Sequence, residues 1–160
     1  MDSKKLLTRG LQKGFGGNTV RKKTTRGPFK VDSGHYETKN GGIYHDEWMA
    51  DRVGGGQELV LTNGKSYTRV YAGGTISAKA LGSLGLTVKD VMVFLKKQIL
   101  DNGDKIRLWA DFKPKPQGDW RYEYIIIDKE KDILVTAGKE SIFYKGKLVF
   151  VHSFVLSPVE

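Results

Sequence analysis

The strongest constraint in this chain is a strand–turn–strand pattern that occurs twice. Residues 56–68 read GQELVLTNGKSYT and residues 138–150 read GKESIFYKGKLVF, so a Gly-x-Glu start and a Gly-Lys turn recur at a constant offset of 82 residues. In each copy the turn separates two runs rich in β-branched and aromatic residues, which is typical of a β-hairpin. A hairpin repeated in this way predicts a fold built from two related halves.

The first copy also contains Gly64-Lys65-Ser66, which matches the last residues of a phosphate-binding P-loop. A P-loop needs a glycine five residues before its Gly-Lys pair, because backbone amides there wrap the phosphates, and Leu59 occupies that position. A P-loop also opens a helix, whereas residues 66–71 favour a strand. The sequence therefore predicts a hairpin turn here and no binding of ATP or GTP.

Periodicity and turn residues place the other elements. Apolar residues at helical spacing predict two helices, over residues 3–14 and 87–100. The glycine-rich segment 73–86 is predicted to be a linker or an irregular turn, and residues 113–118 are predicted to be a turn. We expect strands near residues 31–38, 43–51, 57–62, 66–72, 105–112, 119–128, 132–143 and 147–156.

These elements predict an α+β fold in one domain, residues 1–160, with one half at about 3–73 and the other at about 87–157. The order of helix, strands, helix and strands suggests two αβββ(β) units related by a pseudo-twofold axis. Their antiparallel strands would form a curved sheet or an open barrel, with the two helices packed on its apolar face. A chain of 160 residues is long enough to bury most of its apolar surface as one domain.

The net charge of +9 is concentrated near the N-terminus. Residues 1–30 carry a net charge of +8, whereas residues 31–160 carry +1. Five cations gather in one short run, and they are Arg21, Lys22, Lys23, Arg26 and Lys30. Such a run can neutralise phosphates, so these residues are candidates for nucleic-acid contact. A solvated basic loop that aids solubility is the alternative, and it is favoured because only Phe29 offers a stacking aromatic ring nearby.

Composition and motifs exclude several kinds of chemistry. The chain has no cysteine, which removes disulfides, thiolate catalysis and cysteine–zinc sites. No apolar run is long enough to cross a membrane and no apolar secretory segment is visible, so we expect a cytoplasmic protein without a membrane partner. No Ser–His–Asp order, dinucleotide fingerprint or zinc-protease helix is present, and we predict no cofactor.

Alternating aromatic residues and carboxylates in the first half form the best candidate for a ligand site. Side chains two residues apart in a strand point the same way, so Tyr44, Asp46 and Trp48 share one face. We expect five residues to line a pocket on the sheet for a small ligand or a partner segment, and they are Tyr44, Asp46, Trp48, Glu58 and Tyr71. An enzyme that uses Asp46 and Glu58 is an alternative, because a carboxyl group among aromatic rings can act as a general acid or base.

The repeat distinguishes Glu58, which has a matching carboxylate in the second copy, from Asp46, which has none. Glu140 repeats Glu58, so the favoured interpretation of that pair is a structural polar network in which both carboxylates bond backbone amides. Asp46 aligns with Tyr122 and has no matching carboxylate in the second copy. Asp46 is therefore the stronger functional candidate, and a non-enzymatic binding protein is the favoured function.

His45, Asp46 and Glu47 are the densest cluster of possible metal ligands. On a strand, however, His45 and Glu47 face one side and Asp46 faces the other. His35 or His152 would complete a site only if folding brought it close. We therefore predict no metal site.

A set of short motifs carries a resemblance to a known family. The residues run Tyr44-His45-Asp46-Glu47-Trp48, then Gly56-Gln57-Glu58, then Gly64-Lys65, then Tyr71-Ala72-Gly73. This order resembles an uncharacterised prokaryotic domain family, a domain of unknown function of which some members follow an Xre-type helix-turn-helix. The family also has a degenerate second copy after a helix, and this chain departs from its pattern at Gly42, where the family has an aromatic residue. The resemblance covers about residue 14 to the C-terminus and implies a fold rather than an activity.

Overall fold

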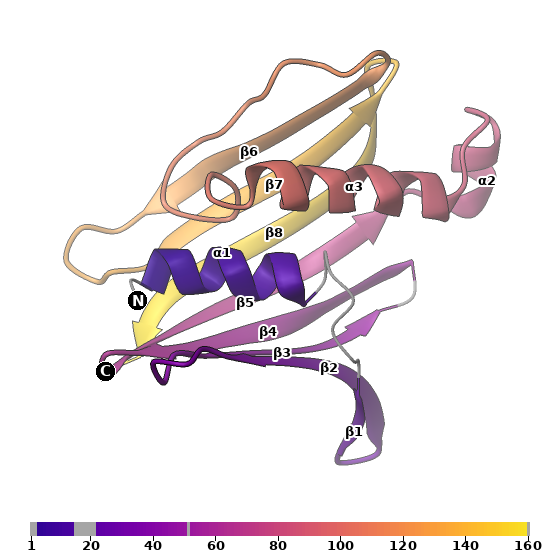
Figure 1. Ribbon diagram of the computed structural model, residues 1–160. Coiled ribbons are helices and arrows are strands. Elements are labelled where there is room, and N and C mark those ends of the chain that lie inside the picture. The colour runs from indigo at the N-terminus through magenta and orange to yellow at the C-terminus, as the bar shows by residue number, and fades with distance from the viewer. Residues whose placement is uncertain (1–2, 15–21, 51, 160) are drawn as a thin grey trace.

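The computed structural model describes residues 3–14, 22–50 and 52–159. In this part of the chain, eight antiparallel strands form one open sheet, which three helices accompany (Figure 1). The strands are β1 (Lys22–Arg26), β2 (Phe29–Glu37), β3 (Ile43–Ala50), β4 (Val53–Thr62), β5 (Lys65–Thr75), β6 (Trp120–Lys129), β7 (Thr136–Tyr144) and β8 (Lys147–Val159). The helices are α1 (Ser3–Lys13), α2 (Ala78–Gly82) and α3 (Val88–Asn102). The predicted α+β class with an antiparallel sheet is confirmed.

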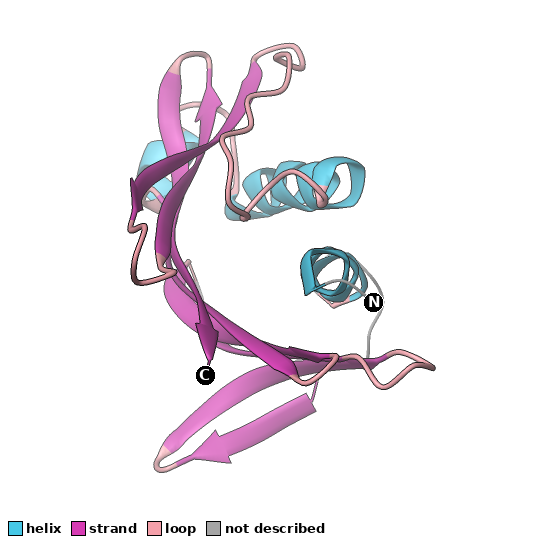
Figure 2. Cartoon of the chain, turned by 90° about the vertical axis from the view of Figure 1, so that its left-hand side faces the viewer, coloured by secondary structure: helices cyan, strands magenta, loops and turns pink. Residues whose placement is uncertain are grey.

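Two meanders meet in the middle of the sheet. The strand order is β1-β2-β3-β4-β5-β8-β7-β6, so every pair of neighbours is sequential except β5 and β8. That pair joins the two meanders over ten residue pairs, from Ser66 opposite Val159 to Thr75 opposite Phe150. The sheet is strongly curved, and α1 and α3 lie on its concave side (Figure 2). One face of the sheet is thus covered by helices.

Both predicted hairpins are present. Asn63 and Gly64 connect β4 to β5, and Lys145 and Gly146 connect β7 to β8. All four residues have positive φ angles, from 48° to 78°, which a type I′ turn requires at its two central residues. Gly64-Lys65-Ser66 is therefore a turn followed by the start of a strand, as the missing P-loop glycine predicts.

The core lies between the concave face of the sheet and the helices. One cluster of buried side chains joins α3 to the second meander and includes Phe150 and Phe154. A smaller cluster joins α1 to the first meander and includes Leu7 and Tyr44. Gly10 of α1 lies directly against the Tyr44 ring, because a Cβ added at Gly10 would be 2.1 Å from that ring. The glycine therefore allows α1 to pack closely on β3.

The predicted strand over residues 105–112 is wrong. This segment is irregular, and Phe112 alone forms an isolated bridge, to Tyr124. Arg107 has a φ of 57°, a left-handed conformation that a strand cannot contain. Its neighbours Ile106 and Leu108 are both buried, so the segment crosses the interior instead of extending the sheet.

The predicted boundaries also differ at other places, and β4 begins at Val53, four residues earlier than predicted. β5 continues to Thr75, and a third helix, α2, lies inside the predicted linker because the Ser77 hydroxyl caps it by accepting from the Ala80 amide. β7 begins at Thr136, four residues later than predicted. The basic run forms an additional edge strand, β1, so the first meander has five strands. No helix of the described residues has the length and apolar character needed to cross a membrane.

Candidate functional site

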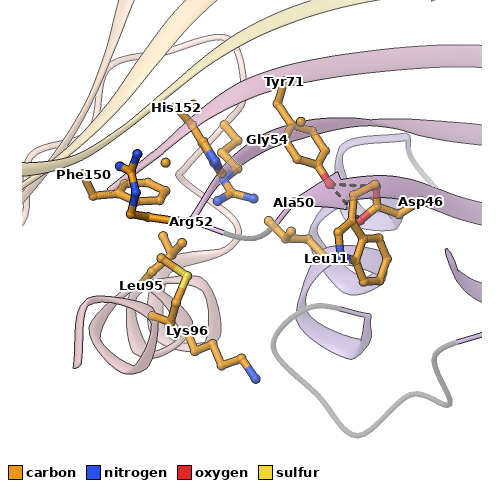
Figure 3. Close-up of a pocket in the computed structure, with 16 residues that line it drawn as sticks. Leu11, Asp46, Ala50, Arg52, Gly54, Tyr71, Leu95, Lys96, Phe150 and His152 are labelled. Atoms are coloured by element: carbon orange, nitrogen blue, oxygen red, sulfur yellow. Dashed lines mark hydrogen bonds between the residues drawn. The ribbon is translucent and has the colours of Figure 1, made fainter. Parts of the chain in front are cut away.

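A cavity of about 310 Å³ lies between the concave face of the sheet and the helices α1 and α3 (Figure 3). Polar side chains on its wall include Asp46 from β3, Tyr71 from β5 and His152 from β8, together with Arg107 from the irregular segment. The apolar lining includes Leu11, Trp48, Ala50, Met92, Leu95 and Phe150. Both meanders and both long helices thus contribute to one cavity.

The cavity gathers part of the predicted ligand site. Asp46, Trp48 and Tyr71 line it. Tyr44 and Glu58 do not line it, and both are almost completely buried. Tyr44 points to the same side of β3 as Asp46, as predicted, but α1 covers it. The first helix, therefore, determines which of the five predicted residues reach the cavity.

Four glycines contribute to the part of the cavity wall that the sheet provides. Gly54, Gly55, Gly73 and Gly74 all line the cavity. Gly73 and Gly74 have φ angles of 148° and 152°, a backbone conformation that favours glycine. A Cβ added at Gly73 would be 2.0 Å from the Val151 carbonyl oxygen. These glycines allow β5 to bend close to β8, and they leave bare backbone where a ligand can approach.

The glycine of each Gly-x-Glu motif makes room for a tyrosine. Gly56 lies opposite Tyr71, and a Cβ added at Gly56 would be 2.6 Å from the Tyr71 hydroxyl oxygen. That hydroxyl group crosses β4 and lies 3.1 Å from Asp46 Oδ1 on β3. In the second meander, a Cβ added at Gly138 would be 2.3 Å from the Tyr124 hydroxyl oxygen. The motif is thus a packing requirement, and in the first meander it positions Tyr71 against Asp46.

Two buried arginine–glutamate pairs connect the meanders. Glu58 accepts hydrogen bonds from Arg69 Nε and, at 2.6 Å, from Arg69 Nη2. Glu140 accepts from Arg107 Nε at 3.1 Å and from Arg107 Nη2 at 2.8 Å. The Arg107 carbonyl oxygen accepts a 2.6 Å hydrogen bond from Arg69 Nη1, so the two pairs form one network. Because each carboxylate has a bidentate guanidinium partner, the four charges of this network cancel.

A tyrosine hydroxyl group completes each pair. Tyr44 donates to Glu58 Oε1 at 2.6 Å, and Tyr122 donates to Glu140 Oε1 at 2.6 Å. Burial alone would raise the pKa of each glutamate, but the charge and hydrogen bonds of its arginine outweigh burial and hold the pKa below the ordinary value. The partners of this network are arginines and tyrosines, not the backbone amides that the sequence predicts. Glu58 is thus an ionised carboxylate whose role is structural.

Asp46 differs from both glutamates in its environment. Among the described residues, its hydrogen bonds come from the Tyr71 hydroxyl group, at 3.1 Å to Oδ1 and 3.5 Å to Oδ2. Burial, followed by the negative charge of Glu58 on the adjacent strand, raises the pKa of Asp46 to about 8. Burial, followed by the charge of Arg107, lowers the pKa of His152 to about 4. At pH 7, Asp46 is thus mainly a neutral carboxylic acid and His152 a neutral imidazole.

Strand register corrects the alignment of the two copies. Asp46 lies opposite Glu58 in the β3–β4 pair, and Tyr124 lies opposite Glu140 in the β6–β7 pair. Asp46 therefore occupies the position of Tyr124 and not that of Tyr122. Tyr44 occupies the position of Tyr122, and both tyrosines donate a hydrogen bond to the glutamate of their own meander. In each meander a loop separates the Gly-x-Glu motif from the strand before it, and the two loops differ in length. An alignment of the motifs alone therefore does not give the register of the preceding strands. With this register too, the first meander has a carboxyl group, that of Asp46, where the second meander has an aromatic side chain.

The predicted basic cluster is divided by the fold. Arg21 lies outside the described residues, and the other four cations belong to a β1–β2 hairpin that projects from the sheet (Figure 1). Side chains alternate along β1, so Lys23 points away from the face that Lys22 and Arg26 share. Arg26 is also engaged, because its Nε donates to Glu47 Oε2 at 3.1 Å. Lys30 lies opposite Thr25, on the Lys23 side of the hairpin. These cations therefore do not form one surface.

The histidines of the first meander lie on the convex face. His35 and His45 are opposite each other on β2 and β3. Their Nε2 atoms lie 2.8 Å from Glu37 Oε1 and 3.1 Å from Glu47 Oε1, respectively. Within residues 3–14, 22–50 and 52–159, no group of three or more His, Asp or Glu side chains is placed to hold a metal ion.

Arg69, Arg107 and His152 are among the side chains of the site that are not predicted from the sequence as pocket residues. Arg69 carries a signal, because it precedes Tyr71 by two residues and therefore points to the same inward face of β5. An inward arginine on a strand requires a buried acid, and Glu58 lies directly opposite it. Arg107 and His152 carry no such signal, because the first lies in an irregular segment and the second reaches the cavity through the β5–β8 contact.

Comparison of the chain with models of protein families, with curated proteins and with solved structures finds no match. The resemblance to the prokaryotic domain family stays a prediction. The function is therefore argued from the geometry and chemistry of the cavity.

Proposed function

We propose that this chain is a binding protein for a small, largely apolar molecule, which it holds in the cavity between the sheet and the helices α1 and α3. The observation that carries this proposal is a cavity of about 310 Å³ whose wall combines apolar side chains with a few polar groups, among them the buried pair of Asp46 and Tyr71. Ligand pockets in proteins have volumes of about 300–1,000 Å³ and combine apolar walls with a few polar groups. The volume of this cavity suits a molecule of two or three rings.

An enzyme that uses both Asp46 and Glu58 has less support. Glu58 does not line the cavity and is held by Arg69 and Tyr44, so it has no path for exchanging a proton with a bound molecule. Among the described residues that line the cavity, Asp46 is the one with a carboxyl group. Because general acid–base chemistry needs groups within hydrogen-bond reach of a substrate, a single buried carboxyl group favours binding over catalysis.

We further propose that the two meanders are repeats related by a pseudo-twofold axis. Support comes from their matching turns and from the tyrosine–glutamate bonds made by Tyr44 and Tyr122. In this view, Asp46 is the position at which the first repeat departs from the second, where Tyr124 donates a 2.7 Å hydrogen bond to the Leu108 carbonyl oxygen. A short aspartate in place of a tyrosine leaves space above the strand, and that space belongs to the cavity.

Nucleic-acid binding by the basic hairpin stays a prediction. The cations of the hairpin lie on both of its faces, so one duplex could contact only part of them at a time. The salt dependence of such binding would therefore be shallower than five engaged cations would give.

A neutral fluorescent probe tests the proposed function. We expect N-phenyl-1-naphthylamine to bind with one-to-one stoichiometry and to gain fluorescence as it leaves water. Ala50 lines the cavity two residues beyond Trp48, so Ala50→Phe should fill the space that the probe occupies. This variant should weaken probe binding at least about tenfold, which corresponds to about 1.4 kcal/mol.

Met49→Phe is the matched control, because Met49 is exposed and its side chain points to the other face of β3. It adds a ring of the same size one residue away and should leave the affinity for the probe unchanged. The absence of saturable binding by the natural protein, or an equal loss in both variants, would contradict the proposed function.

A further inference from the structure

We propose that the ligand of this cavity is a small organic anion, a carboxylate on an aromatic or aliphatic body, whose charged oxygen atoms accept hydrogen bonds on the Tyr71 side of the cavity. This inference rests on the proposed function and adds the chemical class of the ligand. It follows from a wall that combines polar side chains, Tyr71, His152 and Arg52, with apolar side chains such as Leu95 and Phe150 (Figure 3).

The Asp46–Tyr71 pair can present a hydrogen-bond donor to the cavity. Asp46 is buried opposite the charge of Glu58, an environment that favours the neutral carboxylic acid. The Tyr71 hydroxyl group lies 3.1 Å from Asp46 Oδ1 and donates to it. In the neutral state the direction of this bond can reverse, so that the Asp46 O–H group donates to the Tyr71 oxygen and the Tyr71 proton is left for a ligand. A neutral carboxylic acid together with a tyrosine is an established way to stabilise an oxyanion in an apolar site.

Arg107 and His152 stand beside this donor. The bonds of Arg107 to Glu140 use Nε and Nη2, and Nη1 takes no part in them. The His152 ring centroid lies 5.6 Å from that of Tyr71, and its Nδ1 lies 3.8 Å from Glu140 Oε2, beyond hydrogen-bond range. No residue of the described chain forms a hydrogen bond with this Nδ1 atom. An oxyanion in the cavity could therefore accept a second hydrogen bond near Tyr71, from Arg107 Nη1 or from the His152 ring.

The charges on the wall favour an anion over a cation. The Arg69–Glu58 and Arg107–Glu140 pairs cancel, and a neutral Asp46 adds no charge. Arg52, whose guanidinium group donates a hydrogen bond to the Thr75 carbonyl oxygen, also lines the cavity and gives the lining a positive charge. An ammonium group would have to displace the Asp46 proton and approach this positive side chain, whereas a carboxylate is attracted by it.

Apolar side chains provide the rest of the contact. Trp48, Met92, Leu95 and Phe150 line the cavity from three elements, β3, α3 and β8. A flat ring system can lie against them while its carboxylate points to Tyr71. The structure thus pairs an oxyanion site with a surface for an apolar body.

Three probes with one naphthalene body and different head groups test this class of ligand. We expect 2-naphthoate to bind at least about tenfold more tightly at pH 7 than 2-naphthamide or 2-naphthylmethylammonium, measured by calorimetric titration. Tyr71→Phe keeps the ring and removes the donor, so it should weaken naphthoate binding about tenfold. The same variant should change naphthamide binding less than about threefold, because a neutral acceptor gains less from this donor.

Tyr67→Phe is the control variant, because Tyr67 lies on the same strand and does not line the cavity. Tightest binding of the ammonium or the amide by the natural protein would overturn the anion inference and leave the cavity as a binding site. An equal loss of naphthoate affinity in both tyrosine variants would also overturn it. Failure of all three probes and of N-phenyl-1-naphthylamine would overturn the proposed function itself.

Discussion

Arg69→Met is expected to lower the free energy of unfolding by about 3–5 kcal/mol, because it leaves the Glu58 carboxylate without its cation inside the protein. Glu58 is 0 % exposed, and the Tyr44 hydroxyl group would be its remaining hydrogen-bond donor among the described residues. Folded domains are stable by about 5–15 kcal/mol, so this loss is a large part of the total. Urea denaturation at pH 7, followed by circular dichroism, measures the change.

Arg26→Met provides the matched comparison. Arg26 also pairs with a glutamate, Glu47, but its side chain is 61 % exposed, so the loss should stay within about 1 kcal/mol. The double variant Glu58→Leu with Arg69→Met removes both buried charges and should be more stable than Arg69→Met alone. If Arg69→Met costs no more than Arg26→Met, the buried network does not have the structural role described here.

Asp46 should make the folded protein less stable as the pH rises towards 8. In the unfolded chain its carboxyl group loses a proton near the ordinary pKa of 3.8, whereas in the folded protein it retains the proton to about 8. Between these values the folded state binds one more proton than the unfolded state. The free energy of unfolding therefore falls with rising pH, by up to about 1.4 kcal/mol per pH unit.

His152 acts in the opposite direction over part of this range. Its pKa falls from the ordinary 6.5 to about 4 on folding, so the unfolded state gains a proton first as the pH falls. Its contribution to stability is present above pH 6.5 and is lost as the pH falls towards 4. The two groups offset each other between these values, and Asp46 alone remains from pH 6.5 to 8.

Asp46→Asn isolates the aspartate, since the amide does not titrate. From pH 5 to pH 8, the stability of Asp46→Asn relative to the natural protein should increase by about 2–4 kcal/mol, measured by urea denaturation at each pH. Glu47→Gln, one residue away on the convex face, should show no such increase, because the Glu47 pKa lies below its ordinary value. A difference between Asp46→Asn and the natural protein that is independent of pH would contradict the environment assigned to Asp46.

Elements with local signals follow directly from the sequence. Thr87 and Asp90 form a capping box at the start of α3, so this helix begins where the sequence predicts. Asn63-Gly64 and its repeat adopt positive φ angles, which fix the two hairpins and their register. The Tyr44–Asp46–Trp48 alternation predicts a shared face correctly, because side-chain direction in a strand depends only on the backbone.

Features that depend on distant contacts do not follow from the sequence. The left-handed conformation of Arg107 is stable because its carbonyl oxygen and its guanidinium group both bond partners in the sheet, far away in the chain. His152 reaches the cavity through the β5–β8 contact, which no short motif encodes. Tyr44 is removed from the cavity by α1, since helix docking decides which residues of an inward face remain accessible. The cavity is therefore a product of tertiary packing around a site that local patterns indicate only in part.

Amide signals of glycines can locate a bound anion directly, because glycines line the sheet side of the cavity and also occupy turns remote from it. In a ¹H–¹⁵N correlation spectrum titrated with 2-naphthoate, the signals of Gly54, Gly55, Gly73 and Gly74 should shift together and saturate. The turn glycines Gly64, Gly118 and Gly146, which do not line the cavity, should keep their positions. Shifts confined to the turn glycines, or no shift in the four cavity glycines at saturating naphthoate, would contradict a small-anion site beside Asp46 and Tyr71.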